Sequence, residues 1–432
     1  MGSTILKSIS AENFATFADK IEFTTEVDTS KSEYMENTFK WCDYSLNKVS
    51  YIYGANGSGK TFFCKILREI QRLIDWSPLS SVNNAQLLNL PQFKVFESSV
   101  PTFSFDIAYK DKPTTFSIDI GIDDTMYHYE FTILGKIIQS ELLTKKYKRT
   151  EKLLIRTSPA NKDIELRSDF KSLTDTKKVI KEEALCLPML AFLNNDLACK
   201  IVEAIQSIRV FNMAAPRLRP SDSENSFSDE RMSKYVQILK KADPTLRKMT
   251  VSVEEEETAR QKIEGDDFEN REIITTKTMF AVSSEHAVFE NGIETTSEEM
   301  EFFGEESLGT TKLFTALPQL FDILESGGIV FLDEIENGLH ISLVKEIVQL
   351  FMDERLNPYN AQLICTSHQP LLVKNNVRRD QVWVVSKDSF GKSSINRLSQ
   401  MKTSRAKFDI SNKLLEGAFG FNPDMFFDEL KR

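Results

Sequence analysis

Apolar and polar residues alternate along three short segments near the start of the chain, a pattern typical of β-strands. The segments cover residues 5–9, 20–25 and 48–53. A glycine-rich stretch follows the third segment, and apolar residues then recur at every third or fourth position from Phe63 to Ile74. This change of period predicts a strand, a loop and an amphipathic helix in succession.

Short alternating runs return in the next part of the chain, for example at residues 102–107 and 115–120. Turn residues separate these runs, so we expect a lobe of antiparallel sheet over residues 92–170.

From residue 174 onward the apolar period becomes that of a helix. Two helical faces consist of Leu197, Ile201, Ile205 and Ile208, and of Met232, Tyr235, Val236 and Leu239. Ser228 stands where it can cap the second helix. The Ser-rich and Pro-rich residues 216–229 predict an exposed loop.

Strand patterns return at residues 249–253 and 273–282, and the last third alternates between helix and strand. It predicts a helix after Thr311, a strand over 329–332, a helix over 343–351 and a strand over 362–365. Alternating helices and strands are typical of an α/β fold. Because the first strand, loop and helix lie far away in sequence, the predicted α/β core is assembled from distant parts of the chain.

The composition is that of a soluble globular protein. The chain has 432 residues, 41% hydrophobic and 27% charged, enough for two or three domains or one domain with a large insertion. No apolar run reaches the roughly 18 residues of a membrane span, and the start lacks a secretory signal. We therefore expect a cytoplasmic protein without membrane contact. Five scattered cysteines without C-x-x-C spacing argue against a disulfide framework and a zinc site.

The net charge of −10 is unevenly distributed. Residues 254–306 contain 17 acidic and 4 basic residues, a net of −13, so the remainder sums to +3. Basic residues cluster at 145–149 and again between residues 217 and 248. Such clusters either contact nucleic-acid phosphates or form a solvated surface, and acidic runs are usually solvated as well.

Residues 54–61, Gly-Ala-Asn-Gly-Ser-Gly-Lys-Thr, match the P-loop pattern in the strand, loop and helix context that it requires. The glycines let backbone N–H groups surround phosphates at a helix N-terminus. Lys60 reaches the β- and γ-phosphates, and the Thr61 hydroxyl binds Mg²⁺. We therefore expect ATP and Mg²⁺ as ligands. The predicted nucleotide contacts are Gly54, Asn56, Gly57, Ser58, Gly59, Lys60, Thr61 and Phe62.

The predicted strand over 329–332 is followed by two carboxylates, Asp333 and Glu334. The carboxyl edge of an open α/β sheet is where ligands bind. Asp333 is placed to hold Mg²⁺, directly or through water, and Glu334 to orient or deprotonate an attacking water molecule. A buried strand followed by two acids is common by itself, and the P-loop earlier in the chain favours the catalytic interpretation.

Three further stretches complete the pattern: residues 306–310 (Glu-Ser-Leu-Gly-Thr), 336–340 (Glu-Asn-Gly-Leu-His) and 366–368 (Thr-Ser-His). Their order and spacing resemble ABC-type ATPases, and the S-x-G signature resembles the SMC and RecF-like branch. The chain is similar to compact ATPases of bacterial anti-phage and abortive-infection systems: RloA-like proteins, PtuA of Septu, AriA of PARIS and the ATPase half of OLD nucleases. Residues 9–14 and 415–423 share this resemblance.

The resemblance implies that ATP on the P-loop of one subunit is closed by Ser307 and Gly309 of a second subunit. It also implies that His368 senses the γ-phosphate, that residues 336–338 couple the two sites, and that a glutamine contacts Mg²⁺, for which Gln92 is the best placed. Ser307 also has a simpler explanation as a helix cap, and His368 as a structural histidine.

These motifs place both ends of the chain in one ABC-type P-loop ATPase head. We expect residues 1–173 to form its N-terminal part with the β lobe and residues 174–248 to form a helical insertion. Residues 249–432 are then the C-terminal part, with the signature, the two carboxylates and His368.

The resemblance implies an ATP-hydrolysing switch or sensor in an anti-phage defence system. Too few residues follow His368 for the nuclease domain of OLD proteins, and His128 and His286 have no sequence neighbours that suggest a metal site. We therefore expect a homodimer of heads, a separately encoded effector such as a nuclease, and DNA or a phage product as trigger. The alternative is a RecF-like DNA-binding ATPase of replication or repair, whereas the signature disfavours a transporter motor.

Overall fold

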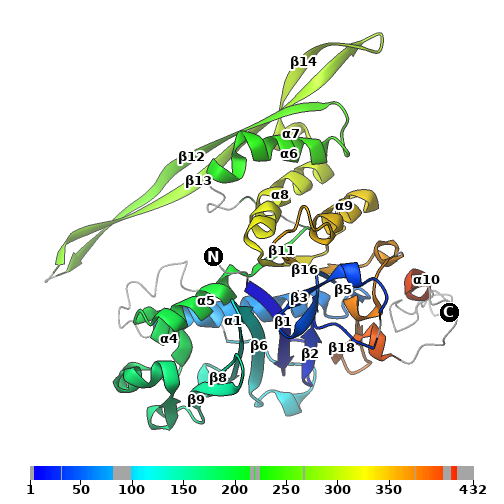
Figure 1. Cartoon of the computed structure of the whole chain (residues 1–432). Coiled ribbons are helices and arrows are strands. Elements are labelled where there is room, and N and C mark those ends of the chain that lie inside the picture. The colour runs from blue at the N-terminus through cyan, green and yellow to red at the C-terminus, as the bar shows by residue number, and fades with distance from the viewer. Residues whose placement is uncertain are drawn as a thin grey trace, which may run out of the picture. The chain divides into compact units, whose positions relative to one another are not determined.

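The computed structural model describes residues 4–30, 32–80, 99–214, 218, 224–265, 268–374, 376–401 and 410–415. The chain divides into two compact units. Unit 1 comprises residues 1–211, 323–335 and 345–432, and unit 2 comprises residues 212–322 and 336–344. The predicted α/β fold with an antiparallel sheet is confirmed, and strands from both ends of the chain share one sheet in unit 1 (Figure 1).

A six-stranded sheet lies at the centre of unit 1, in the order β11-β15-β16-β5-β17-β18. Its strands are β5 (Val49–Gly54), β11 (Arg209–Asn212), β15 (Ile329–Asp333), β16 (Gln362–Ser367), β17 (Val382–Lys387) and β18 (Ser393–Arg397). From β15 to β17 the neighbours run parallel, whereas β18 is antiparallel to β17. Every residue of β5, β15 and β16 is buried, as their continuous apolar runs predict.

Helix α1 (Lys60–Ser80) begins directly after the glycine-rich loop. Its apolar stripe is buried in the same hydrophobic core as Ile52 of β5 and Phe331 of β15. The stripe consists of Phe63, Ile66, Leu67, Ile70 and Ile74. The apolar residues that recur with a helical period thus form the face of α1 that packs against the parallel sheet.

A seven-stranded antiparallel sheet, in the order β10-β9-β8-β7-β6-β1-β2, also belongs to unit 1. Its strands are β1 (Thr4–Glu12), β2 (Ile21–Thr24), β6 (Thr114–Ile122), β7 (Thr125–Leu134), β8 (Ile137–Lys146), β9 (Thr150–Arg156) and β10 (Ile164–Leu166). A short hairpin joins β3 (Thr38–Trp41) to β4 (Tyr44–Asn47). Because β6 pairs with β1 from the start of the chain, the expected β lobe is continuous with the N-terminal strands.

Residues 102–107 do not form the strand that their alternation suggests; they are a loop that leads into the short turn η3 (Ile107–Tyr109). The Asn13 side chain holds this loop. Its Oδ1 accepts the Phe103 N–H (3.2 Å), and its Nδ2 donates to carbonyls of the turn that follows. Asp106 caps η3 through its side chain. These local hydrogen bonds satisfy polar groups that a strand would otherwise offer to a neighbour.

The helical stretch is divided between the two units and does not form one insertion over residues 174–248. Helices α4 (Cys186–Phe192) and α5 (Asp196–Ser207) share the core of unit 1 with α1. Gln71 of α1 donates a hydrogen bond to the Ile205 carbonyl (2.9 Å). Burial of apolar surface against α1 therefore assigns these two helices to the P-loop unit.

Helix α6 (Asp229–Leu239) belongs to unit 2, and its buried residues are the four that the sequence predicts. Ser228 occupies the N-cap position, as expected, but its side chain makes no cap hydrogen bond. Half of the predicted loop over residues 216–229 lies outside the described residues; the described part includes a short turn, η6 (Glu224–Phe227), and the start of α6 at Asp229.

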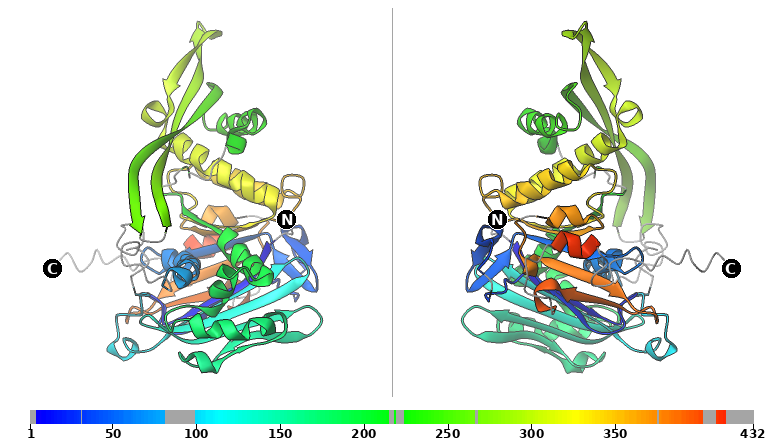
Figure 2. Two further views of the ribbon diagram at one scale, coloured as in Figure 1. Left: turned by 90° about the vertical axis from the view of Figure 1, so that its left-hand side faces the viewer. Right: turned by 90° about the vertical axis from the view of Figure 1, so that its right-hand side faces the viewer.

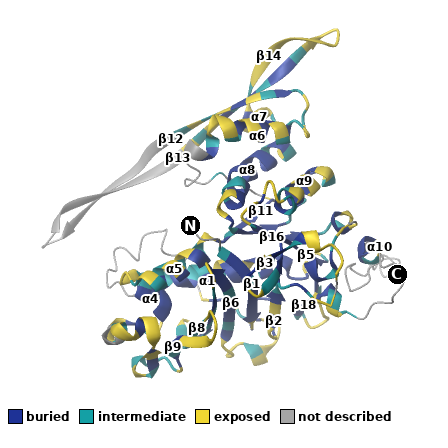
Figure 3. Ribbon diagram, viewed as in Figure 1, coloured by how far each residue is buried: buried dark blue, intermediate teal, exposed yellow. Residues whose placement is uncertain are grey.

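Unit 2 contains a long three-stranded antiparallel sheet, drawn in green and yellow-green in Figure 2. Its strands are β12 (Leu246–Gly265), β13 (Phe268–Glu290) and β14 (Ile293–Glu301). The predicted strands at 249–253 and 273–282 are confirmed, and both extend further than expected. β14 is exposed along almost its whole length (Figure 3), which agrees with a solvated role for its acidic residues.

Two helices of the last third match their predictions, namely α8 (Leu308–Ser326) and α9 (Ile341–Met352). The short helix α7 (Phe302–Glu305) precedes α8, and α10 (Ile410–Leu415) is the last described element. Within the described part of the chain, no helix is long and apolar enough to cross a membrane.

Candidate nucleotide site

The glycine-rich loop connects the end of β5 at Gly54 to the start of α1 at Lys60. Gly57 and Gly59 have φ angles of +75° and +118°, in the region that favours glycine. A Cβ atom at Gly59 would also lie 2.9 Å from two side-chain hydroxyls, and one at Gly54 would lie 2.4 Å from the Val385 carbonyl oxygen. The glycines that the motif requires are therefore needed by the backbone itself.

Lys60 is the first residue of α1, and its side chain folds back over the loop. It is buried, and its Nζ donates hydrogen bonds to the carbonyl oxygens of Gly54 (2.7 Å) and Ala55 (3.0 Å). The same Nζ lies 3.4 Å from Nδ1 of His368. The structure thus brings together two predicted site residues that are 308 positions apart in sequence.

The other loop residues offer groups to a ligand. Asn56 and Gly57 are exposed, and no atom lies within 4 Å of an added Gly57 Cβ. Ser58 is buried, and its Oγ has no hydrogen-bond partner within the described part of the chain. Thr61 and Phe62 are half-buried at the start of α1. Open backbone, an unsatisfied hydroxyl and a buried ammonium group at a helix N-terminus fit the phosphates of a nucleotide.

Asp333 ends β15 and is buried, and Glu334 follows it with a left-handed φ of +54°. Thr366 of β16 contacts both residues. Its Oγ1 donates to Asp333 Oδ1 (2.7 Å) and accepts the Glu334 N–H (2.8 Å). Left-handed backbone is unfavourable for a non-glycine residue, so these hydrogen bonds help to stabilise the turn that carries both carboxylates.

The parallel register sets the ends of three strands side by side. Asp333 ends β15, His368 directly follows β16, and Gly54 ends β5. All three therefore lie at the carboxyl edge of the sheet, where α/β proteins bind ligands. The convergence that the sequence motifs require is present within unit 1.

Thr366 is the residue of this site to which the sequence assigned no role. It belongs to the Thr-Ser-His stretch, but only His368 was expected to act. The partners of a hydroxyl become visible only when β15 and β16 are paired, so no local signal pointed to this threonine.

We expect Thr366→Val to lower ATP turnover while nucleotide binding at the P-loop is retained. Valine has nearly the shape of threonine but removes a donor from Asp333 and an acceptor from Glu334, and each such loss costs about 1–3 kcal/mol. Steady-state turnover and thermal unfolding would measure these effects, with Thr366→Ser as the control that keeps the hydroxyl. Wild-type turnover by Thr366→Val would contradict the positioning role.

Cys64 lies one turn after Lys60 on α1 and is buried. Burial raises the pKa of its thiol well above the ordinary value, and the charge of Asp333 raises this pKa further. A neutral thiol is a poor nucleophile and a poor metal ligand. Cys64 is therefore a packing residue between α1 and the Asp333 end of β15.

The predicted signature residues belong to unit 2, where Ser307 directly precedes α8. The Ser307 Oγ accepts the Thr310 N–H (3.1 Å) and lies 2.8 Å from Thr310 Oγ1. Ser307 is thus a helix cap, which is the simpler of the two interpretations of this serine. Ser307 is also exposed, so its role as a cap does not bury it.

Gly309 allows α8 to approach the loop over residues 336–338. A Cβ at Gly309 would lie 2.9 Å from the Gly338 carbonyl oxygen. Lys312, one turn later and buried, donates a hydrogen bond of 2.6 Å to Asn337 Oδ1. The signature helix therefore holds this loop within unit 2, and Lys312 is a contact that the sequence did not reveal.

His286 lies between two carboxylates, which corrects the expectation that it lacks such neighbours. Its Nε2 is 2.5 Å from Glu306 Oε1, and its Nδ1 is 3.6 Å from Asp243 Oδ2. Asp243 follows α6, His286 lies in β13, and Glu306 precedes α8. Because the three residues come from separate elements, their spacing in sequence carried no signal.

Gln92, expected to contact Mg²⁺, lies outside the described residues. The same holds for most of residues 415–423, which contributed to the resemblance at the C-terminal end.

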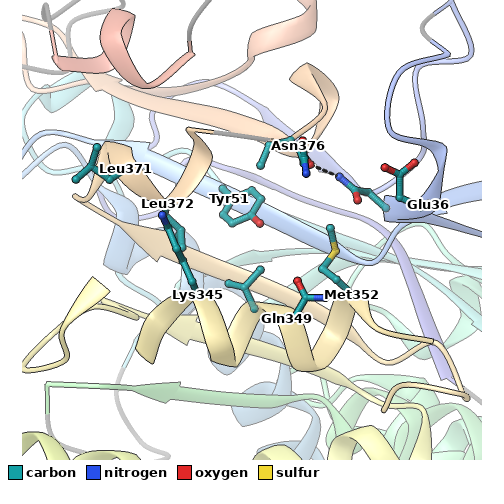
Figure 4. Close-up of a pocket in the computed structure, with 11 residues that line it drawn as sticks. Glu36, Tyr51, Lys345, Gln349, Met352, Leu371, Leu372 and Asn376 are labelled. Atoms are coloured by element: carbon teal, nitrogen blue, oxygen red, sulfur yellow. Dashed lines mark hydrogen bonds between the residues drawn. The ribbon is translucent and has the colours of Figure 1, made fainter. Parts of the chain in front are cut away.

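A cavity of about 400 Å³ in unit 1 is lined by none of the predicted site residues (Figure 4). Its walls include Tyr51 of β5, Lys345 and Met352 of α9, and Leu372 of the short helix η7 (Pro370–Val373). Tyr51 precedes Ile52, and neighbouring residues of a strand point to opposite faces. The cavity and α1 therefore lie on opposite faces of the sheet at β5. The candidate nucleotide site lies instead at the carboxyl edge of this sheet.

A family model described as “AAA domain, putative AbiEii toxin, Type IV TA system” matches residues 209–374. The matched range contains Ser307, the two carboxylates and His368, and it begins after the P-loop. This part of the chain is therefore similar to ATPase domains of that family. No curated protein matches the chain in sequence.

Three solved structures are similar over most of the chain. An SMC head bound to the C-winged helix domain of ScpA is 12% identical, covering 90% of this chain and 97% of that one, with a TM-score of 0.42. The SMC head domain from Thermotoga maritima is 11% identical (92% and 99% covered, TM-score 0.36). The recombination mediator RecF of the RecFOR pathway is 13% identical (91% and 98% covered, TM-score 0.35).

Proposed function

We propose that the chain is an ABC-type ATPase that binds ATP with Mg²⁺ at the P-loop and hydrolyses it to ADP and phosphate. The observation that carries this proposal is the convergence of Lys60, Asp333, Glu334 and His368 at one edge of the parallel sheet. A phosphate-binding ammonium group, a metal-binding carboxylate and a base for water are the groups that phosphoryl transfer uses.

Each residue has a role that its position allows. Thr61 and Asp333 would hold Mg²⁺, which would neutralise charge on the phosphates when bound. Lys60 exchanges its hydrogen bonds to loop carbonyls for stronger, charge-assisted bonds to phosphate oxygens. Glu334 accepts a proton from the attacking water. His368, beside Lys60, contacts the γ-phosphate.

Hydrolysis in this proposal needs a second subunit. Ser307 is exposed at the N-terminus of α8, where backbone N–H groups and the helix dipole favour an anion. We infer that Ser307 and Gly309 of one subunit close on ATP held by the P-loop of the other. The functional form is then a head-to-head homodimer.

Mixing two inactive variants, Lys60→Ala and Ser307→Arg, is expected to restore partial ATPase activity. A mixed dimer has one site in which an intact P-loop faces an intact signature, provided that subunits exchange. Turnover measured against the mixing ratio should pass through a maximum, whereas each variant alone stays inactive. Full activity of Ser307→Arg by itself would show that one chain completes the site.

The proposed cellular role is a cytoplasmic switch or sensor in a bacterial anti-phage defence system, acting on a separate effector such as a nuclease. Support comes from the sequence resemblance and from the description of the matched family as a toxin of a type IV toxin–antitoxin system. Such a switch must bind its effector with different affinity in different nucleotide states. Co-purification with the product of the neighbouring gene, with and without ATP, tests this role. Phage protection by the chain alone would contradict it.

A RecF-like, DNA-binding ATPase is the second candidate. The turn between β8 and β9 carries Lys146, Tyr147, Lys148 and Arg149, all exposed, and Tyr147 is 61% exposed. An exposed ring among cations suits stacking and phosphate contacts. Stimulation of turnover by duplex DNA, lost steeply with added salt, would favour this alternative.

A further inference from the structure

We propose that Glu306 and His286 are positioning residues that tie the signature serine, Ser307, to the three-stranded sheet of unit 2. This inference rests on the proposed ATPase function, because Ser307 matters for turnover only if the signature closes a nucleotide site. It assigns a role to Glu306, which the 306–310 stretch contains without one, and adds His286, which no motif contains.

Glu306 lies in the connection between helices α7 and α8. It is the single residue between the end of α7 at Glu305 and the cap of α8 at Ser307. Its side chain is only 5% exposed, and its Oε1 accepts a hydrogen bond from Ser284 Oγ (2.8 Å) while lying 2.5 Å from His286 Nε2. Both partners belong to β13, so the residue next to the signature serine is anchored to the sheet.

The His286 ring bridges two groups of oxygen atoms. Glu306 faces Nε2, whereas the Thr245 Oγ1 (2.9 Å) and Asp243 Oδ2 (3.6 Å) face Nδ1. One ligand atom each of Asp243, His286 and Glu306 lies within 4.8 Å of the other two, and the ring nitrogens are already within hydrogen-bond distance of Glu306 and Thr245. The group is therefore a chain of hydrogen bonds. Thr245 Oγ1 also donates to Asp243 Oδ1 (2.6 Å), so the contacts run from Asp243 through Thr245 and His286 to Glu306.

The residues that follow Ser307 are held by a second set of contacts. Gly309 contacts the loop at Gly338, and Lys312 holds Asn337, as described above. With Glu306 held by β13, the Ser307 hydroxyl is fixed from both sides in the position that caps α8. Displacing a catalytic contact by about 1 Å can cost up to roughly 100-fold in rate, so loss of the Glu306 anchor should appear in turnover.

The experiment compares Glu306→Gln and His286→Ala with the wild-type chain. Loss of one charge-assisted hydrogen bond corresponds to a fall in kcat of about 10-fold, with ATP affinity of the P-loop changed less than about 2-fold. Amide exchange should become faster at residues 308–311 and stay unchanged in α1. Glu298→Gln is the matched control, because Glu298 is exposed and lies opposite His286 on β14.

Combining the two substitutions should lower kcat no further than the more severe single change, since both remove the same contact. Absence of turnover in the wild-type chain would refute the proposed function, whereas wild-type turnover with unchanged kcat in Glu306→Gln would refute only this inference. If His286→Ala unfolds the chain, the nearly isosteric Glu306→Gln decides. Stoichiometric zinc or manganese in the purified protein, lost in Glu306→Gln, would overturn the hydrogen-bonded arrangement.

Discussion

Replacing Lys60 by alanine is expected to abolish nucleotide binding. Lys60 is the only basic residue in the loop of residues 54–61, and its ammonium group is buried at the start of α1. Charge-assisted hydrogen bonds contribute about 1.5–3 kcal/mol each, so losing two of them lowers the affinity for ATP by about 100-fold or more. Titration with a fluorescent ATP analogue would measure this loss.

Lys65→Ala is the control for this substitution. Lys65 lies in the next turn of α1 and is exposed, and its ammonium group stacks on the Phe62 ring at 4.8 Å. Its removal changes the charge of the helix equally but leaves the loop intact. Equal affinities for Lys60→Ala and Lys65→Ala would show that ATP does not occupy the P-loop as proposed.

Replacing Glu334 by glutamine should preserve ATP binding and stop hydrolysis. Glutamine has the size of glutamate, and the backbone hydrogen bond from residue 334 to Thr366 does not depend on the side chain. What is lost is the base that accepts a proton from water, an effect of about 10²- to 10⁴-fold on turnover. Single-turnover hydrolysis together with a binding titration would separate the two steps.

Asp333→Asn provides the contrast. Asp333 is the proposed Mg²⁺ ligand and accepts a hydrogen bond from Thr366, so its replacement should weaken Mg²⁺-dependent binding as well as turnover. Hydrolysis at the wild-type rate by Glu334→Gln would overturn the assignment of Glu334 as the base. Identical binding and turnover of Asp333→Asn and Glu334→Gln would mean that Asp333 and Glu334 share one role.

Local patterns in the sequence predicted the parts of the site that lie within single elements. The alternation before Gly54 and the helical period after Lys60 gave β5 and α1, and the apolar run before Asp333 gave β15. Each is a continuous stretch in which side-chain periodicity reports the buried face directly. The P-loop needed no tertiary information, because a turn of this kind demands glycine at defined positions.

Predictions based on local pattern failed where distant residues compete for the same groups. Residues 102–107 alternate as a strand does, yet they form a loop in which Asn13 accepts the Phe103 N–H and binds carbonyls of the turn that follows. The helices expected in one insertion are divided, because α5 finds its apolar partner on α1 and α6 lies in unit 2. Periodicity identifies a buried face but does not say which surface will cover it.

The sequence by itself determined which residues are proposed to carry the nucleotide chemistry: the glycine-rich loop with Lys60, the carboxylates after β15, and the histidine after β16. Only the tertiary structure decided which residues support that chemistry, namely Thr366 beneath the two carboxylates, and His286 beside Glu306. The reason is physical. A motif is local because backbone geometry and ligand demand neighbouring residues, whereas a supporting hydrogen bond needs only two atoms in contact, and folding can bring these from any part of the chain.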